Sequence, residues 1–222
     1  MIVVHHLNNS RSQRILWLLE ELELPYEIKR YERDPKTMFA PPELCEIHPL
    51  GKSPVLTDRG NVIAESGAII EYLLERYGQG RFEPAPGSKE RILFQYFLHY
   101  AEGSAMPPLV LSLIFSHLPK SPMPFFMKPI VKGIADKVKK SYVNPQIKLH
   151  FDFLEQHLQK NLWFAGEQFT AADIQMSFAV EAGTARDRSR ARPQLLQFLE
   201  RIHARPAYYA ALEKGGKFEI LG

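Results

Sequence analysis

Residues 2–31, IVVHHLNNSRSQRILWLLEELELPYEIKRY, decide the fold of the N-terminal part of this chain. Residues 2–7 form a β-branched apolar run of the length of a buried strand. Residues 26–31 alternate apolar and polar side chains, as a half-buried strand does. Between the two strands, apolar residues recur at the i, i+3, i+4, i+7 spacing of an amphipathic helix that ends before Pro25; they are Ile15, Leu18, Leu19 and Leu22. Strands joined by a crossover helix run parallel, so we predict a βαβ unit.

Working outward, the next elements complete a small sheet. Residues 34–50 contain four prolines and no clear period, which indicates irregular structure. Residues 54–57 and 61–64 are short strand patterns on either side of a turn, which is typical of a hairpin. A helical pattern follows, for which Ser66 is a suitable N-cap and Gly78 a suitable C-terminal glycine. The predicted order βαβ-ββα therefore closes near residue 78.

The remainder of the chain shows only helical patterns. Residues 79–87 are rich in glycine and proline and read as a linker. Helical patterns over residues 90–106 and 132–160 flank an apolar stretch, residues 107–129, that prolines break. Net charge changes from −3 over residues 1–80 to +6 over residues 81–222. We therefore predict an α/β domain over residues 1–80 and an all-α domain over residues 87–222.

Composition narrows the classes of function. The 222 residues are 45% hydrophobic and 24% charged, which excludes a disordered chain. A single cysteine, Cys45, excludes an internal disulfide framework and makes a thiolate metal site unexpected. The net charge of +3 does not favour nucleic-acid binding. The most apolar stretch, residues 109–115, is far shorter than the ~20 residues that span a bilayer, so we expect a cytoplasmic protein without a membrane partner.

Three short motifs could bind a ligand where elements begin. Ser10 lies between the first strand and the first helix, where free amides and the helix dipole favour an anion, although Ser10 or Ser12 could simply cap the helix. Pro54 opens a strand, which a cis Ser53–Pro54 bond or an edge position would explain; the cis form would turn the backbone of Ser53 toward an extended ligand. Glu65 and Ser66, at the next helix start, suit an ammonium group and a carboxylate.

The order of these motifs resembles a cytosolic glutathione transferase, a thioredoxin-like domain followed by an all-helical domain. The resemblance covers almost the whole chain and is closest to bacterial and fungal serine-type members. It rests on SRSQR at residues 10–14, LWLLEELELPYE at 16–27, PLGKSPVL at 49–56, ES at 65–66 and FTAADI at 169–174.

The resemblance implies roles for individual residues. Ser10 would be the catalytic residue that donates a hydrogen bond to the glutathione sulfur, with Asn9 or Ser12 as alternatives. The backbone of Ser53, before Pro54, would pair with the cysteinyl part. The two ends of glutathione would be held by Lys52 at the glycyl carboxylate, Glu65 at the γ-glutamyl ammonium and Ser66 at the γ-glutamyl carboxylate. Gly67 departs from relatives that carry arginine there.

The resemblance also implies the rest of the reaction. Glutathione would be the co-substrate, with no bound cofactor or metal, and the enzyme would be a homodimer acting on small hydrophobic electrophiles or organic hydroperoxides. The electrophile pocket would lie between the domains, with Tyr100, Met106 and Leu109 as candidates, unless these residues are core. A non-catalytic glutathione-binding protein and a glutathione-dependent isomerase or dehalogenase remain as alternatives.

Overall fold

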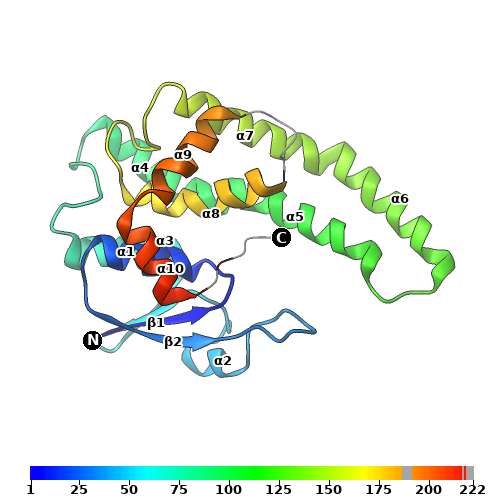
Figure 1. Ribbon diagram of the computed structural model, residues 1–222, viewed down its shortest axis with the longest axis horizontal. Helices are drawn as coiled ribbons and strands as arrows, with labels where there is room; N and C mark the ends of the chain where they lie inside the picture. Colours follow the sequence, from blue (N-terminus) through cyan, green and yellow to red (C-terminus); the bar gives the residue numbers. More distant parts are fainter. Residues whose placement is uncertain (187–191, 217, 219–222) are drawn as a thin grey trace.

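A four-stranded mixed sheet forms the base of the N-terminal part of the computed structural model, which describes residues 1–186, 192–216 and 218 (Figure 1). Its strands lie in the order β2-β1-β3-β4. β1 pairs in parallel with β2, as the predicted βαβ unit requires, and β3 pairs antiparallel with β4, as the predicted hairpin requires. β3 also pairs antiparallel with β1. The strand bounds are β1 Ile2–Leu7, β2 Tyr26–Tyr31, β3 Val55–Asp58 and β4 Asn61–Ala64.

Helices cover both faces of this sheet. α1 (Ser12–Glu21) and α3 (Ser66–Leu73) lie on the face toward the helical domain, and a π-helical turn, η1 (Leu74–Gly78), extends α3. α2 (Glu43–Ile47) lies on the other face, where Leu44 packs with Leu7 and Tyr31. One prediction here is wrong: the N-cap of α3 is Glu65, at φ +69°, and Ser66 is the first helical residue.

The C-terminal part consists of helices in the described residues. Two helical arms, α4 through α5 and α6 through α7, run side by side for much of their length (Figure 1). α8, α9 and α10 then return the chain to the sheet domain. The bounds are α4 Lys89–Tyr100, η2 Ala101–Ala105, α5 Met106–His117, η3 Leu118–Lys120, η4 Phe125–Met127, α6 Lys128–Val138, η5 Lys139–Val143, α7 Asn144–Leu158, α8 Ala171–Arg186, α9 Pro193–His203 and α10 Pro206–Gly215.

The predicted proline-broken stretch is confirmed only in part: the α-helices are interrupted between His117 and Lys128 but not at Pro107. Pro107 and Pro108 stand at the first positions of α5, directly after the π-helical turn η2, and the chain continues as a helix to His117. Proline is tolerated at a helix start because the amide it lacks would have no partner within the helix. The wide turn of η2 supplies such a start in the middle of a long helical arm.

One hydrophobic core joins the two parts of the chain. It runs from β1 and α1 through α3 into α4, α7 and α8. α10 packs against α1, where the ring of Trp17 meets that of Tyr208 edge-on at 5.1 Å. Beside this contact, Arg205 donates from Nη2 to Glu21 Oε2 at 2.8 Å. No helix among the described residues is both long and apolar enough to cross a bilayer.

Candidate functional site

Five of the six residues predicted to bind glutathione line one small cavity between the sheet domain and the helical domain, and the sixth, Ser10, does not. The volume of the cavity is about 170 Å³. Lys52, Ser53 and Pro54 reach it from the loop before β3, and Glu65 and Ser66 from the start of α3. The other lining residues are Arg11, His48, Leu50, Ala64 and Glu102. Charges of both signs line one cleft, so a zwitterionic ligand with separate carboxylates and an ammonium group fits its chemistry.

The loop before β3 is fixed to the sheet by Ser53. Its hydroxyl donates to the carbonyl of His5 at 2.9 Å and accepts from the amide of Leu7 at 3.3 Å. The Ser53–Pro54 peptide bond is cis, the form that the sequence offered as one explanation for a proline opening a strand. These two hydrogen bonds to β1 hold Ser53 at the cavity, and its hydroxyl is therefore already bonded within the protein.

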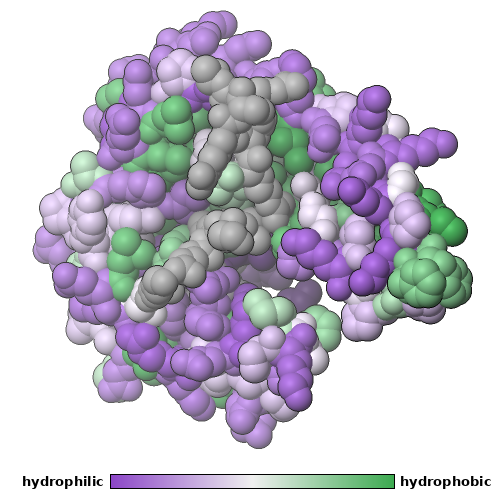
Figure 2. Space-filling model, turned by 45° about the vertical axis from the view of Figure 1, so that its right-hand side comes forward, coloured by the Kyte–Doolittle hydropathy of each residue, from purple (hydrophilic) through white to green (hydrophobic). Residues whose placement is uncertain are grey.

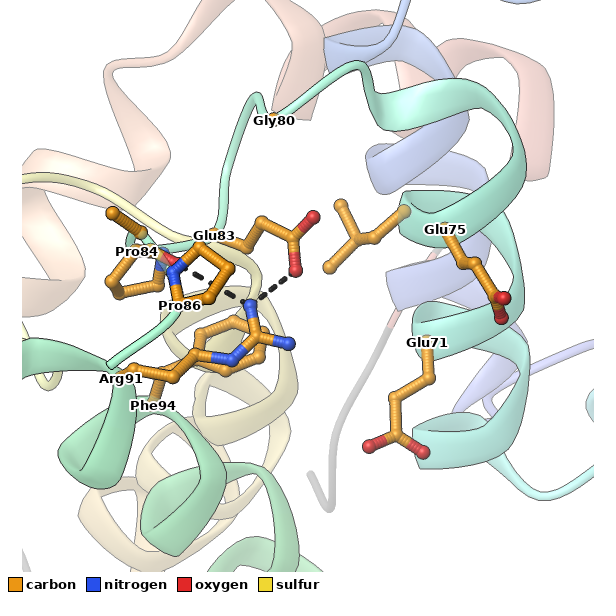
Figure 3. A pocket seen from close by; sticks show the side chains of 10 residues that line it. Glu71, Glu75, Gly80, Glu83, Pro84, Pro86, Arg91 and Phe94 are labelled. Atoms are coloured by element: carbon orange, nitrogen blue, oxygen red, sulfur yellow. Dashed lines mark hydrogen bonds and ion pairs between the residues drawn. The ribbon is translucent and has the colours of Figure 1, made fainter. Parts of the chain in front are cut away.

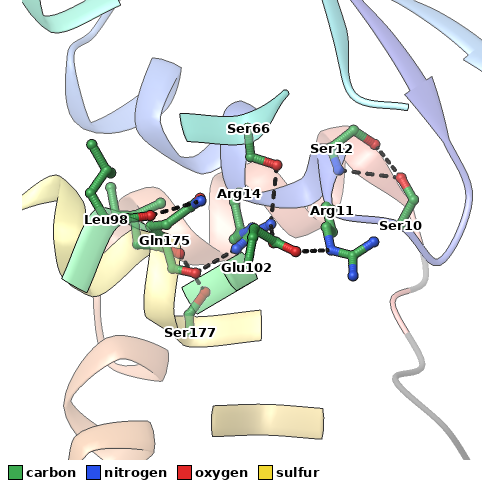
Figure 4. Close-up of polar contacts among 10 residues, drawn as sticks. Ser10, Arg11, Ser12, Arg14, Ser66, Leu98, Glu102, Gln175 and Ser177 are labelled. Atoms are coloured by element: carbon green, nitrogen blue, oxygen red, sulfur yellow. Dashed lines mark hydrogen bonds and ion pairs between the residues drawn. The ribbon is translucent and has the colours of Figure 1, made fainter. Parts of the chain in front are cut away.

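A carboxylate between two arginines connects the cavity to the helical domain (Figure 4). Glu102, in η2, lies 2.6 Å from Nη2 of Arg14 and 3.0 Å from Nε of Arg11. The same Nη2 of Arg14 donates to Ser66 Oγ at 3.1 Å. The guanidinium of Arg14, from α1, thus positions Ser66 at the N-terminus of α3. The next residue, Gly67, has no side chain that could do this.

Arg14 is buried at the centre of this network, with 2% of its side chain exposed. Its Nη1 also donates to the backbone carbonyl of Gln175 in α8. Burial lowers the pKa of the Arg14 guanidinium, and the carboxylate of Glu102 opposes that shift. Arginine remains charged over the physiological range, so Glu102 is the counter-charge that makes its burial tolerable.

Sequence reasoning missed Arg11 and Glu102 as cavity residues. Arg11 lies inside the SRSQR motif beside Ser10, so its position was available from the sequence. Glu102 is 88 residues beyond Arg14 and follows an ordinary helical pattern. Glu102 reaches this cavity only because the helical domain packs so that η2 comes beside Arg11 and Arg14, and no sequence signal indicates that contact.

Ser10 stands beside the cavity in a chain of three hydrogen-bonded side chains. Its Oγ lies 2.7 Å from Ser12 Oγ, which lies 2.9 Å from Nδ1 of His6. The amide of Ser12 also donates to Ser10 Oγ at 3.2 Å, so Ser10 does bond the first amide of α1. Ser10 is 4% exposed and Ser12 fully buried, while Asn9 is exposed. The cavity lining includes Arg11 but none of these three residues.

The three candidates for the electrophile pocket lie in the hydrophobic core. Tyr100, Met106 and Leu109 are all buried, and they belong to the hydrophobic core that joins the two parts of the chain. The hydroxyl of Tyr100 is 2.6 Å from Nδ1 of His150, and burial raises the pKa of that phenol. The structure thus shows them as packing residues, and we do not propose an electrophile site on them.

A larger cavity lies away from the predicted site, at the connection between α3 and α4 (Figure 3). Its volume is about 690 Å³, and Glu71, Glu75 and Glu83 line it. Arg91, on α4, pairs with Glu83 across its wall. None of the predicted ligand-binding residues reaches this cavity. No group of three or more potential metal ligands occurs among the residues that the structure describes.

Comparisons with known proteins agree with the fold. Residues 1–75 match the family model "Glutathione S-transferase, N-terminal domain", and residues 116–206 match "Glutathione S-transferase, C-terminal domain". Glutathione S-transferase 3 of Schizosaccharomyces pombe is 40% identical over 96% of this chain and 88% of its own length. Glutathione S-transferase 1 of Saccharomyces cerevisiae is 36% identical over 96% and 95%.

A solved structure gives the same answer. The glutathione S-transferase of Actinobacillus pleuropneumoniae superposes with a TM-score of 0.78 and 36% identity, over 97% of this chain and 93% of that one. The matched family models and relatives span both the sheet domain and the helical domain. On that basis this chain belongs to the glutathione S-transferase family.

Proposed function

We propose that this transferase binds glutathione in the 170 Å³ cavity and activates its thiol for attack on small hydrophobic electrophiles. The observation that supports this most directly is the meeting of Lys52, Ser53, Glu65 and Ser66 at one cavity from two separate loops. We assign Lys52 to the glycyl carboxylate and the backbone of Ser53, next to Pro54, to the cysteinyl part. Glu65 then takes the γ-glutamyl ammonium and Ser66 the γ-glutamyl carboxylate.

The proposed catalytic residue is Ser10, which makes the enzyme a serine-type member of the family. The thiol of glutathione has an ordinary pKa near ~8.5, and lowering it by about two units requires about 2.7 kcal/mol of preferential stabilisation of the thiolate. A hydroxyl that donates to sulfur and the N-terminus of α1 together supply an effect of that size. Ser10 is favoured over Ser12 because Ser12 is fully buried between Ser10 and His6.

The chemical step needs no covalent enzyme intermediate. The thiol loses its proton to solvent, and the thiolate lone pair forms the new carbon–sulfur bond as the leaving group departs with its electrons. Stabilisation of the thiolate by Ser10 is an electrostatic contribution. The same thiolate would also reduce organic hydroperoxides: its attack on the terminal oxygen breaks the O–O bond and, with one proton, gives the alcohol and the sulfenic acid of glutathione, which a second glutathione converts to the disulfide and water.

We also propose that the protein is a homodimer. α4 and α7 expose Ile92, Tyr96, Leu149 and Phe153, and the rings of Tyr96 and Phe153 are 6.3 Å apart. On each helix the two residues are four positions apart and therefore lie on one face, so the side chains form two adjacent apolar stripes. Such a surface suits burial against a second copy. Equilibrium sedimentation of the wild type and of Ile92→Glu measures this directly.

Three further assignments belong to the same proposal. We place the domain boundary between residues 80 and 87: η1 ends at Gly78, and Ser88 caps α4 by accepting from the amide of Arg91 at 3.1 Å. We place the protein in the cytoplasm, which the exposed free thiol of Cys45 supports. Detoxification is the role that a transferase for hydrophobic electrophiles would have.

An ultraviolet titration of protein-bound glutathione tests the proposed function. We expect the thiolate absorbance of bound glutathione to appear at a pH about two units below that of free glutathione. Ser10→Ala should retain binding and lose most of that shift, while Ser141→Ala, on an exposed surface, should retain both. Binding without a shift in the wild type would indicate a carrier, and absence of binding would refute the assignment of the cavity.

A further inference from the structure

The connection between α5 and α6 extends well beyond the rest of the molecule (Figure 1). α5 and α6 pack against each other, and η3, η4 and their connecting loop form the far end. We call residues 118–140 the basic-apolar tip. Neither the candidate glutathione cavity nor the larger cavities include any residue of this segment.

Large apolar side chains on the tip are open to solvent. Phe125 is 84% exposed, and Phe126 and Ile130 are each 61% exposed. Met127 and Ile134 are exposed as well. Ile130 and Ile134 are one helical turn apart on α6, so they share a face that continues from the phenylalanines. Figure 2 shows a hydrophobic surface on this protruding part of the molecule. An apolar group of this size on a soluble domain indicates a binding surface.

The charge of the tip is strongly positive. Residues 118–140 contain six lysines and one acidic residue, Asp136, for a net charge of +5. Asp136 pairs with Lys139 at 3.2 Å. Among the described residues, no other ion pair involves a residue of the tip. The remaining five lysines are exposed and free to attract an external anion; they are Lys120, Lys128, Lys132, Lys137 and Lys140.

We propose that the basic-apolar tip docks onto an anionic lipid surface. The phenylalanines would enter the boundary between headgroups and acyl chains, and the lysines would remain at the level of the negatively charged headgroups. This departs from the sequence-based expectation of a protein without a membrane partner. It adds surface attachment and no spanning segment, and it does not depend on the assignment of the glutathione cavity.

Charge complementarity favours this occupant over two others. A symmetric contact between the tips of two copies would bring two surfaces of net charge +5 together, which like-charge repulsion opposes. A nucleic acid would satisfy the lysines, but the tip contains no arginine, the residue best suited to phosphates and base edges. The exposed isoleucines and phenylalanines would also remain without an apolar partner on a duplex.

Vesicle co-sedimentation tests the proposal with the full-length protein. Vesicles made of equal parts phosphatidylcholine and phosphatidylglycerol are compared with vesicles of phosphatidylcholine alone. We expect binding to the anionic vesicles that decreases with added salt, and little binding to the neutral ones. Replacing both phenylalanines, Phe125→Ser with Phe126→Ser, should weaken partitioning at least about tenfold. The matched control is Met38→Ser with Phe39→Ser, which removes two exposed apolar side chains outside the tip.

The lysines are tested in the same way. Lys128→Gln with Lys132→Gln should weaken partitioning about 30-fold, since each lysine near an anionic surface contributes about 1 kcal/mol. Lys36→Gln with Lys160→Gln, at two exposed positions elsewhere, should leave it unchanged. Circular dichroism and glutathione binding, equal in all variants, would show that folding and the glutathione cavity are intact.

Three outcomes would overturn the proposal. The first is absence of binding to anionic vesicles at low salt. The second is binding that the tip variants and their controls reduce equally, which would indicate a general charge effect of the whole protein. The third is a change of oligomeric state in the phenylalanine variant without a change in lipid binding, which would assign the tip to a second copy of the chain.

Discussion

His6 shows what burial does to a single titratable residue beside the candidate site. It is 4% exposed, and burial lowers the pKa of its imidazole to about 4. Nearby Arg30 lowers this pKa further, while a hydrogen bond to the backbone of Gly215 opposes the shift. At neutral pH the ring is therefore uncharged, and its Nδ1 can accept a hydrogen bond from the hydroxyl of Ser12. Ser12 in turn is hydrogen-bonded to Ser10, so the protonation state of His6 affects the hydrogen bonding of the proposed catalytic hydroxyl.

The stability of the protein should depend on pH through His6. Its pKa in the folded state lies below the ordinary 6.5, so the unfolded chain binds more protons between these values. The stabilising effect is full above pH 6.5 and is lost as pH falls through about 4, by up to about 3 kcal/mol. Urea denaturation at pH 7 and pH 5 measures the slope.

The variant His6→Asn isolates this contribution. Asparagine can accept from Ser12 but does not titrate, so the fall in stability between pH 7 and pH 5 should be smaller than in the wild type. His99→Asn, at an exposed position on α4, is the matched control. An identical pH slope in wild type and His6→Asn would show that the imidazole is not held neutral by the fold.

At the scale of elements, η2 decides how the helical domain meets the sheet domain. This π-helical turn places Glu102 between Arg11 and Arg14 of the segment that opens α1. π-helical turns inside α-helices are frequent at functional sites because they shift the direction of side chains. Here the shifted side chain is the carboxylate that neutralises a buried guanidinium and lines the candidate cavity.

Replacing this carboxylate should affect both stability and glutathione binding. Glu102→Gln leaves the charge of Arg14 buried without its counter-charge, so we expect a loss of about 2 kcal/mol in the free energy of unfolding. Arg11 also loses its partner, so the Kd for glutathione should rise severalfold. Calorimetric titration and urea denaturation measure the two effects.

Glu71→Gln is a suitable control, because Glu71 is an exposed carboxylate on α3 that lines the other cavity. Neither its stability nor its affinity for glutathione should change by more than about 0.5 kcal/mol. A Glu102→Gln protein as stable as the wild type would mean that Arg14 finds sufficient compensation in the carbonyl of Gln175 and the hydroxyl of Ser66.

At the scale of the whole molecule, the hydrophobic core continues through both domains, so the two parts of the chain should unfold together. α10 strengthens this connection, since Arg205 holds Glu21 and Arg30 donates to the carbonyl of Gly215 at 2.9 Å. The last helix of the chain thereby packs on the first. Stability is expected to belong to the complete chain and not to each domain separately.

The two tryptophans report on this cooperativity. Trp17 lies in α1 and Trp163 lies between α7 and α8, and both are buried. In Trp17→Phe fluorescence follows the helical domain, and in Trp163→Phe it follows the sheet domain. Within each variant we expect the fluorescence and far-ultraviolet circular dichroism midpoints to coincide. Separate midpoints for the two probes would show that the domains unfold independently.

Local sequence patterns were sufficient to predict the elements whose burial and turn residues lie within a few positions of one another. The periodicity of residues 2–31 predicted the parallel βαβ unit, and the spacing of the hairpin predicted β3 and β4. The same reasoning was wrong at Ser66, where the chain turns through a positive φ at Glu65 before the helix begins. It was also wrong at Pro107, because a π-helical turn is not visible in apolar spacing.

The sequence by itself determined the two-part fold and picked out Ser53, Pro54, Glu65 and Ser66 among the residues that line the candidate glutathione cavity, because they stand at strand and helix starts that local patterns fix. Only the tertiary structure decided that Glu102 stands between Arg11 and Arg14, that Tyr100, Met106 and Leu109 are packed in the core, and that the phenylalanines of the tip face solvent. The type of an apolar or charged residue does not indicate which residues far away in the sequence it contacts. Those neighbours are set by how separate helices pack, and that packing is a property of the whole chain.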